Sequence, residues 1–319
     1  MTCFNPKPAI YIPYTKIDEK TGEIYKTRRI KFLNTWDIEG DTPNKENIVM
    51  IPCGKCAGCM IDKSNDWATR AMLEAKIHKK NCFVTLTYDN KHISKNRSLI
   101  KKDIQNFFKR LRNHAKEKLR YICAGEYGPK TLRPHAHAII YNYRPNDLKL
   151  FGQNKTGNKL YTSKSLEKIW GKGYVMIGNV DYQSAAYVAR YVLKKAYGIK
   201  KDIFIKHKRE PEFQLASRRG GIGIGAFQNE AIKAQIKQNL GVLINVNGQV
   251  IHKKIPTFLR NKWKEENREE YFKIFDERAH ALKEIARTRE TSKNPYQYLK
   301  DVIEKTKQQI KRLDKRKDL

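Results

Sequence analysis

The chain has 319 residues, of which 66 are Lys or Arg and 33 are Asp or Glu, so its formal net charge is +33. Such an excess of positive charge predicts a polyanionic partner, usually nucleic acid, although a ribosomal-type or membrane-surface protein would share it. No apolar run approaches the roughly 20 residues that a membrane-spanning helix needs, and the first residues lack the apolar core of a secretory signal. The six cysteines do not resemble a secreted disulfide framework. We therefore expect no membrane association and a reducing, cytoplasmic location.

The distribution of apolar residues and turn signals predicts the order of elements. Residues 1–52 lack a helical period, so we expect short strands and loops there, and a helix is expected after the cysteine-rich stretch 53–59. Ser184 can cap the last helix of the middle part of the chain. From residue 82 the expected elements are, in chain order, a strand at 82–88, a helix at 104–115, strands at 119–126 and 135–143, a helix at 163–170, a strand at 174–180 and a helix at 184–197.

This β-α-β-β-α-β-α order predicts an α+β fold. Its first six elements match a ferredoxin-like or RNA-recognition-like domain, in which one antiparallel sheet carries helices on one face. The last helix is an addition. We expect a glycine-rich loop at 218–225, flexible or facing DNA, and a charged, helical tail from residue 279. The expected domains are an N-terminal segment 1–60, a central domain 61–200 and a basic C-terminal extension 201–319.

His135 and His137 predict a metal site. Side chains alternate across a strand, so both imidazoles point to the same face. If strands 119–126 and 135–143 pair as a hairpin, Glu126 lies opposite His135, with Cβ atoms about 5 Å apart. Three ligands would leave open positions for water or phosphate oxygens, as a catalytic divalent ion requires. The alternative is a pair of surface histidines on a half-buried strand.

Tyr187 and Tyr191 are four residues apart and share one face of the last predicted helix, which Lys194 extends by a turn. A tyrosine hydroxyl has a pKa near 10 and is a poor nucleophile unless a metal polarises the phosphate and a cation stabilises the developing charge. In-line attack on a phosphodiester would leave a covalent phosphotyrosine. The alternative is an ordinary amphipathic helix with two aromatic residues on its rim.

Cys53, Cys56 and Cys59 have the two-residue spacings that suit thiolate ligation of one metal, and Cys3 is the candidate fourth ligand. A structural Zn²⁺ is the favoured hypothesis. Free thiols and an iron–sulfur cluster are the alternatives. Cys82 and Cys123 lie in apolar strands and are expected to be buried small hydrophobic residues.

Three ordered stretches of the chain resemble the three motifs of the HUH endonuclease superfamily, named after two histidines separated by a hydrophobic residue. They are the segment 83–88, Pro134-His135-Ala136-His137-Ala138 and Tyr187-x-x-x-Tyr191-x-x-Lys194. The resemblance is closer to the replication-initiation proteins of microviruses of the gokushovirus type, which are small single-stranded DNA phages. The shared features are an early Cys, a Cys-Gly-x-Cys-x-Gly-Cys segment, Gly-Glu-Tyr-Gly before Arg-Pro-His-x-His, and Tyr-Val-Ala-x-Tyr-Val, here at Cys3, 53–59, 125–128, 133–137 and 187–192. The resemblance extends to about residue 260.

This resemblance implies that the protein nicks one strand of double-stranded phage DNA at the origin. One tyrosine becomes linked to the 5′ end, and the 3′ hydroxyl primes rolling-circle synthesis. The second tyrosine cleaves the regenerated origin, after which the circle is closed. Tyr191 matches a single-tyrosine pattern with Lys194 and is ranked ahead of Tyr187 as the first nucleophile. Related enzymes use Mg²⁺ or Mn²⁺, and the ligand types here do not distinguish the two.

The resemblance also places the protein in the cytoplasm of a bacterial host. No Gly-x-x-x-x-Gly-Lys-Ser/Thr segment occurs, so we expect it to use a host helicase and polymerase. Two alternatives remain open. A plasmid- or transposon-type relative would share all three motifs. A non-enzymatic, zinc-containing nucleic-acid-binding protein would explain the charge and the cysteines without needing the histidines or tyrosines.

Overall fold

The computed structural model describes residues 3–17, 22, 24–33, 48–128, 131–154, 156–190, 204, 206–246, 248–274, 304 and 308. Two of the predicted site residues, Tyr191 and Lys194, lie outside these ranges. The end of the predicted tyrosine helix and nearly all of the charged tail from residue 279 also lie outside them.

A seven-stranded antiparallel sheet forms the centre of the molecule, in the order β10-β5-β6-β4-β9-β8-β7. Its four middle strands put the first and third strands of the β-α-β-β-α-β series side by side, as a ferredoxin-like arrangement requires. The predicted α+β class and antiparallel sheet are confirmed. The strands are β4 (Asn81–Tyr88), β5 (Arg120–Tyr127), β6 (Pro134–Tyr141), β7 (Lys149–Gln153), β8 (Lys159–Thr162), β9 (Gly173–Gly178) and β10 (Phe213–Ala216).

Both edges of this sheet extend beyond the predicted elements. β7 and β8 were not predicted, and their pairing is interrupted by a bulge between Leu150 and Gly152. β10 pairs with β5 although it comes from the part of the chain beyond residue 200 that we expected to form a separate extension. The sheet therefore crosses that expected boundary.

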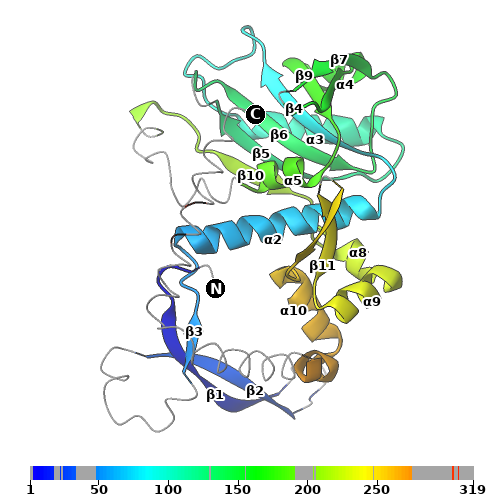
Figure 1. Cartoon of the computed structure of the whole chain (residues 1–319). Coiled ribbons are helices and arrows are strands. Elements are labelled where there is room, and N and C mark those ends of the chain that lie inside the picture. The colour runs from blue at the N-terminus through cyan, green and yellow to red at the C-terminus, as the bar shows by residue number, and fades with distance from the viewer. Residues whose placement is uncertain are drawn as a thin grey trace.

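Helices cover both faces of the sheet. On one face lie α3 (Lys101–His114) and α4 (Lys164–Trp170), whose buried side chains pack over Ala136 and Ala138, the alanines that alternate with the two histidines. These are the two helices that the predicted six-element domain places on one face. The other face is covered by α2 (Ala57–Lys76) and α5 (Tyr182–Ala189), and Figure 1 shows α2 running across the molecule beneath the sheet. The two helices can pack closely on this face because their contacting residues are mostly alanines.

α5 begins earlier than predicted. The N-cap is Asp181 rather than Ser184, and the two form a reciprocal capping box. The Ser184 backbone N–H donates to Oδ1 of Asp181 at 2.6 Å, and the Asp181 N–H donates to Oγ of Ser184 at 2.9 Å. Ser184 thus takes part in the cap from the third helical position.

Two smaller units adjoin α2. At its N-terminal end, β1 (Lys7–Ile17), β2 (Ile24–Phe32) and β3 (Val49–Ile51) form a sheet in the order β2-β1-β3. Strands were expected here, but β1 and β2 are long rather than short. Against the C-terminal half of α2, a third core is built around Phe227 and Trp263. Its elements are α8 (Ile224–Gln228), α9 (Glu230–Asn239), β11 (Val242–Val246), β12 (Gln249–Lys253) and α10 (Thr257–Glu266). Among the described residues, no helix is long and apolar enough to cross a membrane.

Candidate metal and tyrosine site

Glu126, His135 and His137 converge on the face of the sheet that α5 covers. Glu126 pairs directly with His135 across β5 and β6, which confirms the predicted register. His137 lies two residues further along β6 and therefore on the same face. One ligand atom from each of the three lies within 4.8 Å of the others. Glu126 is 4% exposed and His137 9%, so these two residues are largely shielded from water, whereas His135 is half-buried.

Two oxygen atoms orient the imidazoles. Nδ1 of His135 lies 3.0 Å from the carbonyl oxygen of Arg133, so Nδ1 carries the proton and Nε2 the lone pair. Nδ1 of His137 lies 3.0 Å from Oγ1 of Thr85, the β4 residue opposite it in the sheet. Contacts of this kind fix the ring orientation of metal-binding histidines. Sequence reasoning missed Thr85 because the predicted fold places β4 beside β6 but does not fix the register between them.

Tyr187 is half-buried and lies directly against this group. Its ring centroid is 4.6 Å from that of His137, at an interplanar angle of 79°. Phe83 stacks on His137 at 5.6 Å and meets the Tyr187 ring edge-on at 6.4 Å. The structure therefore brings one of the two predicted tyrosines to the predicted metal ligands.

Arg190 places a cation beside that tyrosine. Its Cζ lies 4.7 Å from the centroid of the Tyr187 ring, a cation–π contact. Sequence reasoning assigned this role to Lys194 and missed Arg190. The signal was available, because residues three apart on a helix are neighbours.

Burial of small side chains fixes the position of α5. Ala185, Val188 and Ala189 are completely buried. They pack in one cluster with Ile139 of β6 and Ala71 of α2. α2 is therefore part of the support for Tyr187, although it lies far from it in the sequence.

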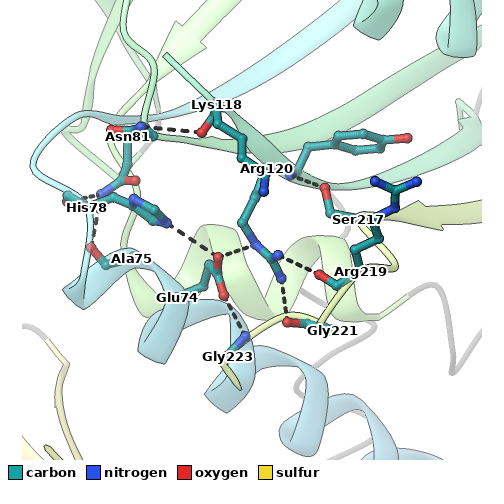
Figure 2. A network of polar contacts seen from close by, with 12 residues as sticks. Glu74, Ala75, His78, Asn81, Lys118, Arg120, Ser217, Arg219, Gly221 and Gly223 are labelled. Carbon is teal, nitrogen blue, oxygen red and sulfur yellow. Dashed lines mark hydrogen bonds and ion pairs between the residues drawn. The ribbon is translucent and has the colours of Figure 1, made fainter. Parts of the chain in front are cut away.

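A buried ion pair joins α2 to β5, the strand that carries Glu126 (Figure 2). Glu74 of α2 is 1% exposed, and its Oε1 lies 2.5 Å from Nε of Arg120. Nε2 of His78 also reaches Glu74 Oε1, at 3.3 Å. Because Arg120 and Glu126 lie on the same strand, this pair holds the helix in register with the site.

The same ion pair anchors the glycine-rich stretch. Arg120 donates to the carbonyl oxygens of Arg219, at 2.8 Å, and Gly221, while the Gly223 N–H donates to Oε2 of Glu74 at 2.6 Å (Figure 2). Gly223 has a φ of +88°, which glycine adopts without steric cost. Hydrogen bonds to buried groups hold this part, which argues against the flexible form of the predicted loop; that it faces DNA stays a prediction.

A second cluster brings together the sulfur atoms of all four predicted cysteines, each within 4.8 Å of the others. Sγ of Cys56 lies 3.8 Å from Sγ of Cys3, and Sγ of Cys53 lies 4.0 Å from Sγ of Cys59. Backbone N–H groups point at these sulfurs, including that of Cys53 toward Cys3 at 3.2 Å and that of Phe4 toward Cys56 at 3.3 Å.

The thiols of this cluster differ in pKa. Backbone N–H groups of Lys55 and Cys56 lower the pKa of the Cys53 thiol to about 6. Burial raises the pKa of Cys59 well above its usual value. The other two cysteines, Cys82 and Cys123, are completely buried in the central sheet as expected, and burial raises the pKa of the Cys82 thiol to about 12.

Comparison with known proteins identifies the family. The model of the replication-associated protein ORF2 family matches residues 81–196, which include β4, the three metal-site residues and α5. The chain is 32% identical over 298 residues to the replication-associated protein ORF2 of Spiroplasma virus 4. That match covers 89% of this chain and 91% of that protein.

Two further relatives match shorter parts. The chain is 40% identical over 161 residues to the replication-associated protein VP4 of Bdellovibrio phage phiMH2K, covering 48% of this chain and 51% of that protein. It is 33% identical over 201 residues to the replication-associated protein ORF4 of Chlamydia phage 1, covering 60% and 50%. No solved structure matches the chain. The chain belongs to this family of phage replication-associated proteins and is a rolling-circle replication protein of the microvirus type.

Proposed function

We propose that the protein initiates phage DNA replication as an HUH-type nickase, cutting one strand at the origin with a tyrosine nucleophile. The observation that carries this proposal is the convergence of Glu126, His135 and His137 with the ring of Tyr187 against His137. A protein that only bound DNA would not need a carboxylate and two oriented imidazoles beside a tyrosine.

The proposed reaction is a transesterification. The tyrosine hydroxyl oxygen attacks the phosphorus, an O–P bond forms, and the bond from phosphorus to the 3′ oxygen breaks. The leaving oxygen takes up a proton in place of the one that the tyrosine loses, so the products are a 5′-phosphotyrosine and a 3′ hydroxyl. Attack by a 3′ hydroxyl on the phosphotyrosine reverses the step and rejoins the strand. Tyr187 and Tyr191 supply two nucleophiles for these two transfers. The roles proposed for Tyr191 and Lys194 rest on the sequence alone, because both residues lie outside the described ranges.

The residues present fit a catalytic divalent ion. A carboxylate and two imidazoles with Nδ1 engaged elsewhere leave Nε2 of each histidine to coordinate Mg²⁺ or Mn²⁺. When bound, the ion would polarise the phosphate under attack. Arg190, at the Tyr187 ring, would favour the negative charge that develops on the phenol oxygen.

The cysteine cluster fits a structural Zn²⁺. Four thiolates around a tetrahedral ion, with Zn–S bonds of about 2.3 Å, lie about 3.8 Å apart. The separations of 3.8 and 4.0 Å match this value. The ion would join the N-terminal strands to the start of α2. Single- and double-stranded origin DNA are the proposed substrates, host helicase and polymerase the proposed partners, and the host cytoplasm the proposed location.

The test is a nicking assay on single-stranded origin DNA with Mg²⁺ or Mn²⁺, in which a denaturing gel detects the covalent adduct. We expect an adduct with the wild type and none with the double variant Tyr187→Phe/Tyr191→Phe. The matched control is Tyr174→Phe, because Tyr174 is 66% exposed on β9 and should react as wild type. If no origin DNA gives an adduct with either metal, the nickase assignment fails and the DNA-binding alternative is favoured.

A further inference from the structure

The N-terminal sheet of β1, β2 and β3 is strongly basic. Its strands contain six basic residues and no Asp or Glu. The nearest acidic residues, such as Asp18 and Glu19, lie between the two long strands in the sequence. This sheet is also separate from the proposed metal site, since Figure 1 shows it on the opposite side of α2 from the central sheet. The basic residues are Lys7, Lys16, Lys26, Arg28, Arg29 and Lys31.

The same sheet is unusually apolar at its surface. Of the eleven large hydrophobic side chains exposed among the described residues, seven lie on these three strands. Proteins rarely leave apolar side chains gathered in this way unless they contact a partner. The seven are Tyr11, Tyr14, Ile17, Ile24, Ile30, Phe32 and Met50.

The strand register mixes the two kinds of side chain on one face. Tyr11 lies opposite Ile30, Phe32 opposite Ala9, and Arg28 opposite Pro13. Tyr11 and Phe32 are 46% and 53% exposed. Phe32 and Arg28 are both diagonal neighbours of Tyr11 across the strand pair, about 7–8 Å away and within reach of long side chains, so two exposed rings and a guanidinium group follow one another on the same face.

The combination of exposed apolar and basic side chains favours one class of partner over another. An apolar protein surface would match the exposed hydrophobic side chains but not the six basic residues that the strands carry. Bases offer rings that stack on aromatic side chains, and phosphates offer charges that pair with Lys and Arg, which is how proteins hold single strands without reading their sequence. We propose that the N-terminal sheet is a second DNA site that binds single-stranded DNA independently of sequence.

The cysteine cluster ties this sheet to the rest of the protein. Cys3 precedes β1, Cys53 follows β3, and Cys56 is the N-cap of α2, whose far half packs on α5. α2 has 20 residues, so it is about 30 Å long. A strand held on the sheet would therefore lie at a set distance from Tyr187, rather than on a loose arm.

The test measures the binding of the full chain to a labelled oligothymidine that lacks any origin sequence. Fluorescence anisotropy is recorded without added Mg²⁺ or Mn²⁺, so the result does not depend on nicking. Loss of a stacking ring costs about 5- to 150-fold in affinity, so Tyr11→Ala/Phe32→Ala should raise the Kd at least about fivefold. The matched control is Leu150→Ala/Phe151→Ala, two apolar residues on β7 that are more exposed than Tyr11 and Phe32, which should change the Kd by less than about twofold.

A charge variant keeps the test valid if loss of the rings disturbs the sheet. Lys26→Gln/Arg28→Gln should lower the salt dependence of log K by about 1.4, since each single-strand phosphate contact contributes about 0.7. Unchanged affinity and salt dependence in both variants would overturn the proposal. A change of oligomeric state would also overturn it. The wild type would then sediment as a dimer, whereas Tyr11→Ala/Phe32→Ala would sediment as a monomer with unaltered DNA binding. Equal loss of affinity for a duplex of the same length would exclude single-strand specificity.

Discussion

Replacing Glu74 by Gln should destabilise the protein strongly, although Glu74 lies outside the proposed reaction centre. Glu74 is 1% exposed, and its carboxylate neutralises Arg120, whose side chain is 18% exposed. Gln keeps the size and an oxygen for the Gly223 N–H but removes the charge. Arg120 then stays largely buried without a counter-ion. Removing one partner of a buried pair costs about 3–5 kcal/mol, and the partial exposure of Arg120 favours the lower end, about 3 kcal/mol.

Equilibrium unfolding in urea measures this loss. Glu117→Gln is the control, because Glu117 is exposed in the loop between α3 and β5 and should shift the free energy of unfolding by no more than about 0.5 kcal/mol. Combining Glu74→Gln with Arg120→Gln should cost less than the sum of the two single changes, with a coupling of about 1 kcal/mol or more. A loss below about 1 kcal/mol for Glu74→Gln, or additive effects in the double variant, would refute the view that this pair fixes α2 to β5.

Three further predictions rest on single contacts. Thr85→Val removes the oxygen at His137 Nδ1 without changing side-chain size, and should weaken Mn²⁺ binding by about 10- to 100-fold in calorimetry; unchanged affinity would contradict the orienting role. Cys56→Ser should reduce bound zinc well below one equivalent by elemental analysis, whereas Cys123→Ser should retain it; iron in place of zinc, or no metal in the wild type, would exclude the zinc site. Gly173→Ala should lose about 1–3 kcal/mol in urea unfolding, because φ is +141° and the added Cβ would lie 2.4 Å from Asp89 N. Gly152→Ala, with open space around it, should lose little, and equal losses would refute the steric argument.

The core of the site could be predicted from the sequence because strand periodicity is strict. Alternation places His135 and His137 on one face, and a short connection between two strands leaves few registers, of which one pairs Glu126 with His135. The same alternation places Ala136 and Ala138 on the opposite face, where α3 and α4 pack. These inferences needed only local spacing.

Other parts depended on contacts between segments far apart in the sequence. The four residues of β10 form a strand because they pair with β5, and nothing in so short a run predicts that pairing. Thr85 reaches His137 only through the β4–β6 register. Glu74 reads as a solvated helix residue until Arg120, 46 positions later, is brought beside it by packing. Local patterns do not contain this information.

The covalent link between protein and DNA tests the proposed nicking mechanism most directly. After reaction with single-stranded origin DNA and Mn²⁺, the protein is digested with trypsin and nuclease, and mass spectrometry locates the nucleotide-bearing peptide. We expect a 5′-phosphate ester on the hydroxyl of Tyr187 or Tyr191, lost when Glu126, His135 or His137 is replaced by Ala. A nucleotide attached to any other residue, or a cut strand with no attached protein, would contradict it.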